Sequence, residues 1–352
     1  AAINKPANSD IYSTQMAKFV DTVGKIAQPE YLPYAFYIEG GGLAVENALK
    51  AAFDWKSRKN LEKGKSPGQN LVVHLKDCFH GRTGYTMSLT DSPDKRKVQY
   101  FPKFDWPRIS NPSMIFPENN ENISIVKKLE QQSIHELKNI LNNSKDDIAC
   151  LIIEPIQGEG GDNHFRHEYF KELKLLSKEN DFLLIYDEDQ TGIGITGKMW
   201  AHEHYSVKPD VISFGKKAQV CGALAGPRID EVEKNVFKES SRINSTFGGN
   251  LTDMVRFKII LNVIKEENLI ENARIKGEYL LNKINSLAEE FPGFVTLKLY
   301  SHSIQNMFAR TTSSTFTISL LCSPSPLICG WISFRSACIQ FEIAVAYGPL
   351  IV

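Results

Sequence analysis

Short apolar runs alternate with amphipathic stretches along most of the chain, and this alternation predicts an α/β fold. Apolar runs that end in polar residues or glycines predict strands over Tyr34–Ile38, Asn70–Leu75, Ile148–Ile153, Phe182–Asp187 and Asp210–Phe214. Apolar residues at helical spacing predict helices over Thr14–Ile26, Leu43–Lys59, Glu130–Asn143, His164–Lys178, Leu251–Lys265 and Glu271–Glu290. We therefore expect an open, mostly parallel sheet with helices packed on it.

Polar residues follow two of these predicted strands at the edge where ligands of open α/β sheets bind. Asp187 ends one apolar run, and Lys216 follows the next. Pyridoxal phosphate needs a lysine amine for a Schiff base and a carboxylate that keeps its pyridine nitrogen protonated. Asp187 and Lys216 match these two needs, although each residue taken alone is more often a strand cap or a solvated surface group.

The sequence around these two residues is specific to one family. The segments DEDQTGIGITGKMWAHEHYSVKPDVISFGKKAQVCG and NSTFGGNLTDMVR resemble the class III aminotransferases, and within them most closely the L-lysine 6-aminotransferases. The resemblance extends from Ala1 to about Thr296. It implies a pyridoxal-phosphate-dependent transferase of fold type I. It also assigns the Schiff base to Lys216, which spacing alone does not separate from Lys217.

A triple glycine between the first strand and its helix is a candidate phosphate site. Amides in the first turn of a helix lack intrahelical acceptors, and the helix dipole favours an anion there. Such a turn more often only reverses the chain. The segment EGGGLAVENALKAAFDWKSR resembles the phosphate loop of the family, which puts Gly41 and Gly42 on the phosphate.

The FHGR segment after the second strand carries an aromatic ring and an arginine. An aromatic side chain can cover a pyridine ring, and an arginine can hold a carboxylate through two hydrogen bonds. The resemblance assigns Phe79 to cofactor stacking and Arg82 to the α-carboxylate of the substrate. It leaves His80 without a defined role.

Two glutamates follow the strand that ends at Ile153, in the segment EPIQGEGG. As isolated residues, Glu154 and Glu159 are typical of a turn. The resemblance makes Glu159 a gate that neutralises an active-site arginine in one half-reaction and releases it in the other. The released arginine then binds a dicarboxylic acid.

The residues after the central strand include a departure from the family. Side chains alternate along a strand, so Asp187 and Asp189 are expected on one side and Glu188 on the other. The family has valine where Asp189 stands, packed on the cofactor ring. A carboxylate there loses apolar contact and is repelled by Asp187. The change reflects either a real substitution or a sequence error.

Two further residues have roles that come from the resemblance alone. Gln190 is expected to hydrogen-bond the ring hydroxyl of the cofactor. Thr246 is expected to reach the phosphate in the neighbouring subunit, which makes a homodimer the functional unit.

Composition excludes some classes of partner. The chain has 352 residues, enough for two domains, and 41 basic residues balance 41 acidic ones. Because nucleic acids and membrane surfaces attract clustered basic charge, neither is an expected partner. The six cysteines contain no CxxC pair and no regular framework, and no signal peptide precedes Thr14, so we expect a cytoplasmic protein without a metal site.

The last segment has a different character. No Lys or Asp occurs after Lys298, half of the cysteines lie there, and neither helical nor strand periodicity is visible. We expect a large cofactor domain over 1–265, the start of an incomplete small C-terminal domain over 266–298, and an anomalous tail over 299–352. A reading-frame shift near Thr296 is our preferred explanation, and a membrane tail the lesser one. The sequence does not begin with Met, and we expect it to start inside a longer gene product.

The resemblance predicts transfer of the ε-amino group of L-lysine to 2-oxoglutarate, giving L-glutamate and 2-aminoadipate 6-semialdehyde. One alternative is a class III aminotransferase for ornithine, 4-aminobutyrate or a similar ω-amine. A second is a pseudoenzyme or fragment that retains the fold but holds the cofactor poorly, because of Asp189 and the altered tail.

Overall fold

The computed structural model describes residues 7–8, 10–290, 316–319, 330–334 and 342–345. The chain divides into two compact units, residues 1–194 with 198–269, and residues 195–197 with 270–352. The predictions that concern Thr296 and Lys298 fall on residues outside this set. No helix among the described residues is long and apolar enough to cross a membrane.

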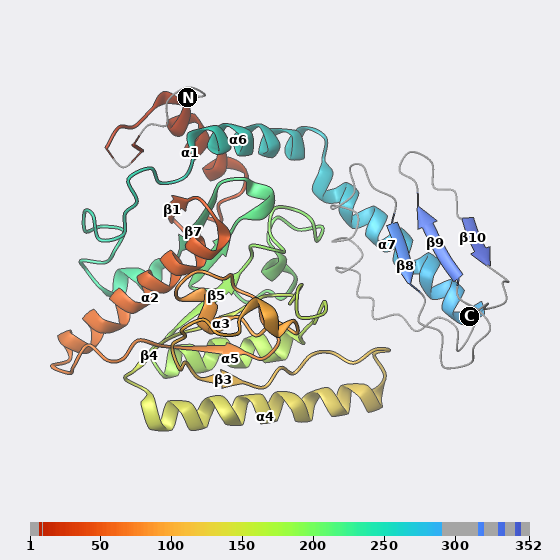
Figure 1. The fold of residues 1–352 in the computed structure, drawn as a ribbon, viewed down its shortest axis with the longest axis horizontal. Helices are drawn as coiled ribbons and strands as arrows, with labels where there is room; N and C mark the ends of the chain where they lie inside the picture. The colour runs from red at the N-terminus through yellow and green to blue at the C-terminus, as the bar shows by residue number, and fades with distance from the viewer. Residues whose placement is uncertain (1–6, 9, 291–315, 320–329, 335–341, 346–352) are drawn as a thin grey trace. The chain divides into compact units, whose positions relative to one another are not determined.

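The first unit is built around a seven-stranded sheet (Figure 1). Its strand order is β1-β7-β6-β5-β4-β2-β3. The strands are β1 (Tyr34–Ile38), β2 (Leu71–Leu75), β3 (Arg108–Ile109), β4 (Ile148–Ile153), β5 (Leu183–Asp187), β6 (Val211–Phe214) and β7 (Cys221–Ala225). Neighbours from β3 to β6 are parallel, whereas β7 is antiparallel to both β6 and β1. The expected open, mostly parallel sheet is confirmed.

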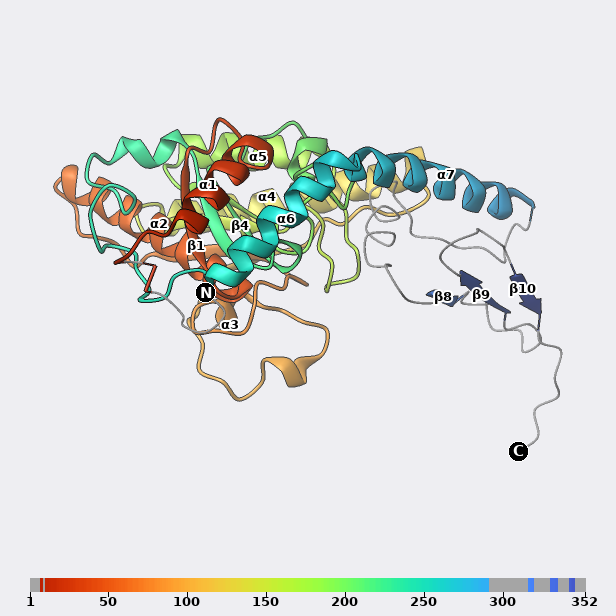
Figure 2. The same ribbon diagram turned by 90° about the horizontal axis from the view of Figure 1, so that it is seen from above.

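Helices cover both faces of this sheet. They are α1 (Thr14–Ile26), α2 (Gly41–Glu62), α4 (Asn120–Ser144), α5 (His167–Glu179) and α6 (Leu251–Glu266), with a short α3 (Thr86–Leu89). Trp55 and Leu49 of α2 pack on one face, against the side chains of Val72, Ile152 and Ile185. The other face packs against α1, α4, α5 and α6, and α1 and α6 lie side by side (Figure 2). Because both faces are covered, β4 and β5 are buried along their whole length.

The structure differs from the predicted elements where local pattern is weak. Helix α4 begins at Asn120 instead of Glu130, because Asn119 caps it by accepting the amide hydrogen of Asn122. Strand β7 was not predicted, since its CGALA sequence has small residues of low strand propensity. Its position comes from pairing with β1 and β6, where a side chain at Gly222 would meet the Phe214 ring.

The second unit contains α7 (Leu269–Glu290) and a three-stranded antiparallel sheet. The sheet is formed by β8 (Phe316–Ser319), β9 (Gly330–Phe334) and β10 (Glu342–Val345), in the order β10-β9-β8. The sequence shows no strand periodicity in this part of the chain. Strands this short carry too few alternating positions for a periodicity to be visible.

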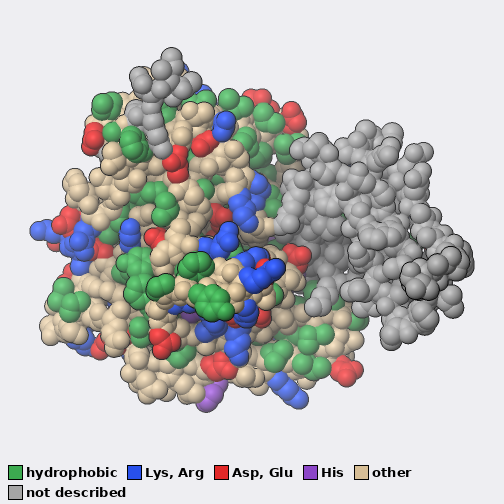
Figure 3. All heavy atoms as spheres, in the orientation of Figure 1, with side chains coloured by type: hydrophobic (Ala, Val, Ile, Leu, Met, Phe, Trp, Pro, Cys, Tyr) green, Lys and Arg blue, Asp and Glu red, His purple; other side chains and the backbone are tan. Residues whose placement is uncertain are grey.

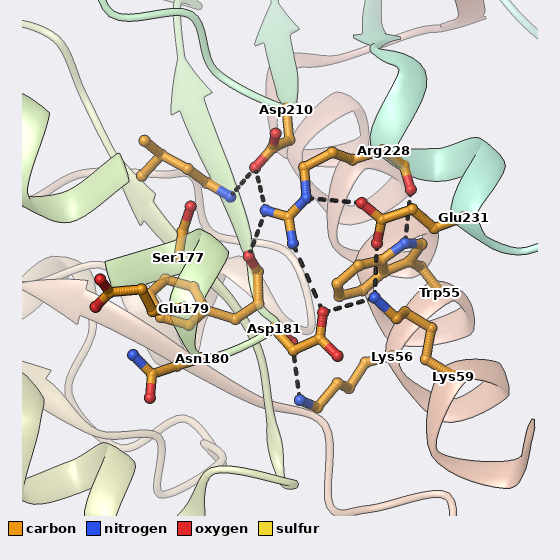
Figure 4. Close-up of polar contacts among 12 residues, drawn as sticks. Trp55, Lys56, Lys59, Ser177, Glu179, Asn180, Asp181, Asp210, Arg228 and Glu231 are labelled. Carbon is orange, nitrogen blue, oxygen red and sulfur yellow. Dashed lines mark hydrogen bonds and ion pairs between the residues drawn. The ribbon is translucent and has the colours of Figure 1, made fainter. Parts of the chain in front are cut away.

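Charged groups of both signs occur over the visible face of the molecule (Figure 3), in keeping with the equal numbers of acidic and basic residues. At the amino ends of β5 and β6 they form a network around Arg228 (Figure 4). Arg228 donates to the Phe182 carbonyl at 2.9 Å and to Asp210 at 3.1 Å. Its guanidinium also lies 5.1 Å from the centre of the Trp55 ring of α2. The network links the helix to the strand ends, on the side of the sheet away from the cofactor edge.

Asp210 holds this network together, because it binds two cations. Its carboxylate lies 2.5 Å from the Lys174 amine and 3.1 Å from Arg228, and it also accepts the Leu184 amide hydrogen at 2.8 Å. We expect Asp210→Ala to lower the free energy of unfolding by about 3 kcal/mol in urea denaturation, because two partly buried cations lose the buried carboxylate that they share. Asp21→Ala removes an exposed ion pair with Lys25 and should change it by no more than about 0.5 kcal/mol. Equal effects of the two substitutions would contradict this role.

Candidate active site

The carboxyl ends of β1, β2, β4, β5 and β6 lie at one edge of the sheet, because these strands all run in the same direction. The loops that leave these ends carry almost all of the predicted site residues. Segments far apart in sequence therefore meet at this edge, as expected for a ligand site in an open α/β sheet.

Asp187 is the last residue of β5 and is buried, with hydrogen-bond donors on both carboxylate oxygens. Oδ2 lies 2.8 Å from His80 Nδ1, and Oδ1 accepts from the Ser213 hydroxyl at 3.0 Å and from the Asp189 amide at 3.1 Å. Burial by itself lowers the pKa of His80, but Cys78 and the Asp187 carboxylate raise it well above its usual value. His80 and Ser213 thus hold the Asp187 carboxylate in one orientation.

Lys216 follows β6 in a single 3-10 turn, η3 (Lys216–Ala218). Its φ of 49° is left-handed, a conformation that costs energy for a residue with a side chain. Its amine hydrogen-bonds the side-chain oxygen of Gln190, while the amine of Lys217 donates to the Gln190 carbonyl at 2.5 Å. Both lysines therefore contact the residue that follows Asp189, and their geometry alone does not separate them.

The glycine turn after β1 forms the start of α2. Gly40 precedes the helix with φ 92°, and the first intrahelical bond runs from the Ala44 amide to the Gly40 carbonyl at 3.0 Å. The amides of Gly41, Gly42 and Leu43 therefore have no intrahelical acceptor, which suits an anion. A side chain on Gly42 would press on Thr83 at 3.1 Å, so the FHGR loop packs directly on this helix end.

Asp189 lies against the same helix end. A Cβ atom on Gly41 would lie 2.6 Å from each carboxylate oxygen of Asp189, and one on Gly215 would overlap Oδ1. Glycine at these two positions is what makes room for the Asp189 carboxyl. Strand β5 ends at Asp187, so Asp189 lies in the turn that follows, with its amide 3.1 Å from Asp187 Oδ1, while Glu188 contacts His202 at 2.9 Å.

Phe79 and Glu159 come together through Lys97. The Lys97 amine lies 6.0 Å from the centre of the Phe79 ring and forms an ion pair with Glu159. Glu159 also accepts a hydrogen bond from the Ser92 hydroxyl at 2.7 Å. The cation that Glu159 binds among the described residues is thus a lysine, and the arginine expected from the family stays a prediction.

Glu154 joins two of the loops. It is buried and accepts amide hydrogens from Phe79 at 2.8 Å and from Gly158 at 3.3 Å. Burial raises its pKa to about 7, with the His80 charge lowering it and Asp187 raising it. Glu154 therefore fixes the backbone beside the Phe79 ring, a role that its turn context did not reveal.

Arg82 and Thr246 are exposed. Arg82 lies beside Gly81, which packs on Gly42, but it forms no ion pair with a described residue. Thr246 lies in the loop before α6, where Asn250 caps the helix. The structure thus brings Asp187, Asp189 and the two lysines together, and leaves Arg82 and Thr246 at the surface.

Comparison with known proteins decides the family. The sequence profile of the family Aminotransferase class-III matches residues 7–297 of this chain. The chain belongs to the class III aminotransferases. The resemblance found in the sequence is confirmed, and so is the fold type I architecture of the pyridoxal-phosphate-dependent transferases.

The relatives of this class III aminotransferase include L-lysine-epsilon aminotransferases. The Mycobacterium tuberculosis protein is 51% identical over 296 residues, which are 84% of this chain and 65% of that protein. The Streptomyces clavuligerus protein is 45% identical over 84% of this chain and 64% of its own length. The chain therefore spans about 65% of the length of the curated relatives it matches.

A solved structure of lysine aminotransferase from M. tuberculosis in the internal aldimine form is also similar. It superposes with a TM-score of 0.82 at 46% identity, covering 95% of this chain and 70% of that one. The computed fold therefore agrees with that of an experimentally determined family member.

Three site residues of this class III aminotransferase were not identified from the sequence. His80 was left without a role, and Ser213 and Lys97 were not considered. Ser213 carried a usable signal, because a hydroxyl inside the buried run VISF needs a partner. Lys97 carried none, since it belongs to the basic run 95–97 in a segment of loop composition.

The raised pKa of Glu154 makes a prediction about stability and pH. The ionised carboxylate is less favourable in the folded state, so the stability that Glu154 contributes is full below about pH 4.5 and is lost as the pH rises through 7. Between about pH 5 and pH 8, the free energy of unfolding of the wild type should fall by about 2 kcal/mol relative to that of Glu154→Gln. Urea denaturation across this range measures the difference. The exposed Glu62→Gln is the control, and the prediction is wrong if Glu154→Gln parallels it.

Proposed function

We propose that this class III aminotransferase transfers the ε-amino group of L-lysine to 2-oxoglutarate. The products are L-glutamate and 2-aminoadipate 6-semialdehyde. The observation that carries the proposal is the 51% identity to L-lysine-epsilon aminotransferases, combined with Asp187 and Lys216 at adjacent strand ends. No nucleic acid or membrane partner is part of the proposal, and a cytoplasmic location fits the buried free cysteines Cys78, Cys150 and Cys221.

The described residues fit pyridoxal phosphate, the cofactor of this family. Gly41 and Gly42 offer backbone amides at a helix N-terminus for the phosphate. Asp187 offers a buried carboxylate for the pyridine nitrogen, Lys216 an amine for the aldehyde, and Phe79 a ring to stack on it. When bound, the cofactor supplies an electron sink for the carbon that loses or gains the amino group.

Asp187, Lys216 and Gln190 then have separate roles in the proposed reaction. His80 and Ser213 hydrogen-bond the Asp187 carboxylate and hold it in place, where it can receive the pyridine nitrogen. The Lys216 Nζ accepts and returns the proton of the substrate carbon, as a general base and acid. Gln190, which already accepts from that amine, orients it and is available to the ring hydroxyl.

Substrate binding draws on two charged groups at the rim. Arg82 is exposed and forms no ion pair with a described residue, so it is available for the α-carboxylate of lysine, which leaves the ε-amine to reach the cofactor. Glu159 provides the second group. Its ion pair with Lys97 must open before a dicarboxylic acid can bind the Lys97 amine. Ornithine and 4-aminobutyrate have fewer carbons than lysine between the carboxylate and the terminal amine, so a terminal amine at the cofactor would place their carboxylates elsewhere.

We also propose a homodimer in which Thr246 serves the neighbouring site. Thr246 is exposed, so another chain can reach it. A patch of aromatic side chains lies on the segment before β3, with exposed fractions of 95% for Tyr100, 55% for Phe101 and 53% for Phe104. Exposed aromatic residues in one segment are typical of a protein interface.

The function is tested by comparing amino donors with 2-oxoglutarate as acceptor. We expect kcat/KM to be at least about tenfold higher for L-lysine than for L-ornithine or 4-aminobutyrate, because a mismatch of one methylene alone is worth about 1–3 kcal/mol. Measured glutamate formation gives the ratio. A higher value for either competitor would assign the chain to the alternative, and no turnover with any donor would support the pseudoenzyme.

The choice between the two lysines is tested by substitution. Lys216→Ala should lower kcat by more than about 10³, since it removes both the covalent attachment and the general base. Lys217→Ala should stay within about tenfold of the wild type, since the proposal gives its amine no part in the chemistry. After borohydride reduction, mass spectrometry should find the pyridoxyl phosphate group on Lys216. Its presence on Lys217 would reverse the assignment.

The dimer is tested by complementation. A mixed dimer of Lys216→Ala and Thr246→Ala chains contains one site with an intact Lys216 and, from the partner, an intact Thr246. We expect mixing the two weakly active variants to restore lysine-dependent activity. If differential tags show that mixed dimers form but activity does not return, Thr246 serves the site of its own chain.

A further inference from the structure

The Asp189 carboxyl is the one described carboxyl that lies between the glycine turn and the Lys216 loop. Its oxygens occupy the space that a Cβ atom would need on Gly41, the first residue of α2, and on Gly215, the residue before Lys216. Oδ1 is buried without a hydrogen-bond partner. A buried oxygen without a partner is costly when the group is ionised, so the surroundings disfavour the ionised form of the Asp189 carboxyl.

Charged and titratable groups face Asp189 from each neighbouring element. Asp187 lies at the end of β5, with His80 bonded to it, and Lys216 and Lys217 lie after β6. The pKa of Asp189 is raised to about 6, first by burial and then by Asp187, while the two lysines act to lower it. Cys221 at the start of β7 has its pKa raised to about 11, first by burial and then by Asp189, so it stays a neutral thiol.

These neighbours give Asp189 two effects when it is ionised. Its charge lies beside the helix end that would hold a phosphate, so it repels that anion. Its charge also attracts that of Lys216. The protonated carboxyl has neither effect, and it can donate a hydrogen bond.

We propose that Asp189 controls loading of the phosphate-bearing cofactor, which binds tightly when the Asp189 carboxyl is protonated and weakly when it is ionised. The proposal rests on the proposed function, because it takes the Gly41 helix end as the phosphate site. It assigns to Asp189 a pH-dependent control of cofactor affinity.

Linkage gives the size and the sign of the effect. Binding that requires the protonated form is weakened by the fraction of protein in that form. The dissociation constant should therefore be level below about pH 5 and should rise by up to about tenfold for each pH unit above the Asp189 pKa. Asp189→Asn keeps the shape of the side chain without the charge, so this component should vanish.

Titration calorimetry with pyridoxine 5′-phosphate tests the proposal on the full chain. This probe has the ring and phosphate but no aldehyde, so Schiff base formation with Lys216 does not enter. The wild type, Asp189→Asn and the distant Asp21→Asn are compared from about pH 5 to pH 8. Titration of the probe's own phosphate is common to all three and cancels in the ratio of dissociation constants.

The expected result is a ratio of wild type to Asp189→Asn that grows by about tenfold or more between pH 6 and pH 8, while Asp21→Asn follows the wild type. A constant ratio overturns the proposal and leaves the proposed function standing. No binding by any of the three proteins at any pH contradicts the cofactor assignment itself, and the proposal with it.

Unfolding without ligand gives an independent readout. The folded-state pKa of Asp189 is raised, so its contribution to stability is present below its unfolded pKa and is lost as the pH rises through about 6. Thermal melts of Asp189→Asn should therefore exceed those of the wild type at pH 8 and converge with them near pH 4. Parallel curves would mean that the carboxyl is not strained, which removes the basis of the proposal.

Discussion

The burial of the Asp187 carboxylate is the constraint on which the rest of the site depends. A buried carboxylate is stable only if donors surround it, and Ser213 from the neighbouring strand and His80 from a distant loop supply them. His80 must therefore be held in place, and its amide is fixed by the Thr90 hydroxyl at 3.0 Å. The hydrogen bond from His80 to the Asp187 carboxylate thus positions the FHGR loop, which packs on the glycine turn of α2.

The two edges of the sheet use charge in opposite ways. At the amino ends of the strands, Asp210, Arg228 and Lys174 satisfy one another, and the network serves the stability of the fold. At the carboxyl ends, several polar atoms remain without partners, including His80 Nε2, Glu159 Oε2 and Asp189 Oδ1. Unsatisfied buried groups cost folding free energy, and such groups at this edge are typical of a site whose partner is a ligand.

The sequence predicted the parts of the site that depend on strand ends and turns. Asp187, Lys216 and Gly41 could be placed because an apolar run and its polar end determine them locally. His80, by contrast, lies 107 residues from Asp187 along the chain, and their contact arises only when the loops fold together. Strand β7 and the early start of α4 were missed for a similar reason, since tertiary pairing and a single cap overrode a weak local pattern.

The central claim is that Asp187 and Lys216 form one cofactor site that acts on lysine. The most direct measurement is the visible absorption of the purified chain mixed with pyridoxal phosphate, followed as L-lysine and then 2-oxoglutarate are added. The account predicts a new visible band that Lys216→Ala lacks, that lysine bleaches and that 2-oxoglutarate restores. A band that forms equally in Lys216→Ala, or that lysine leaves unchanged, would contradict it.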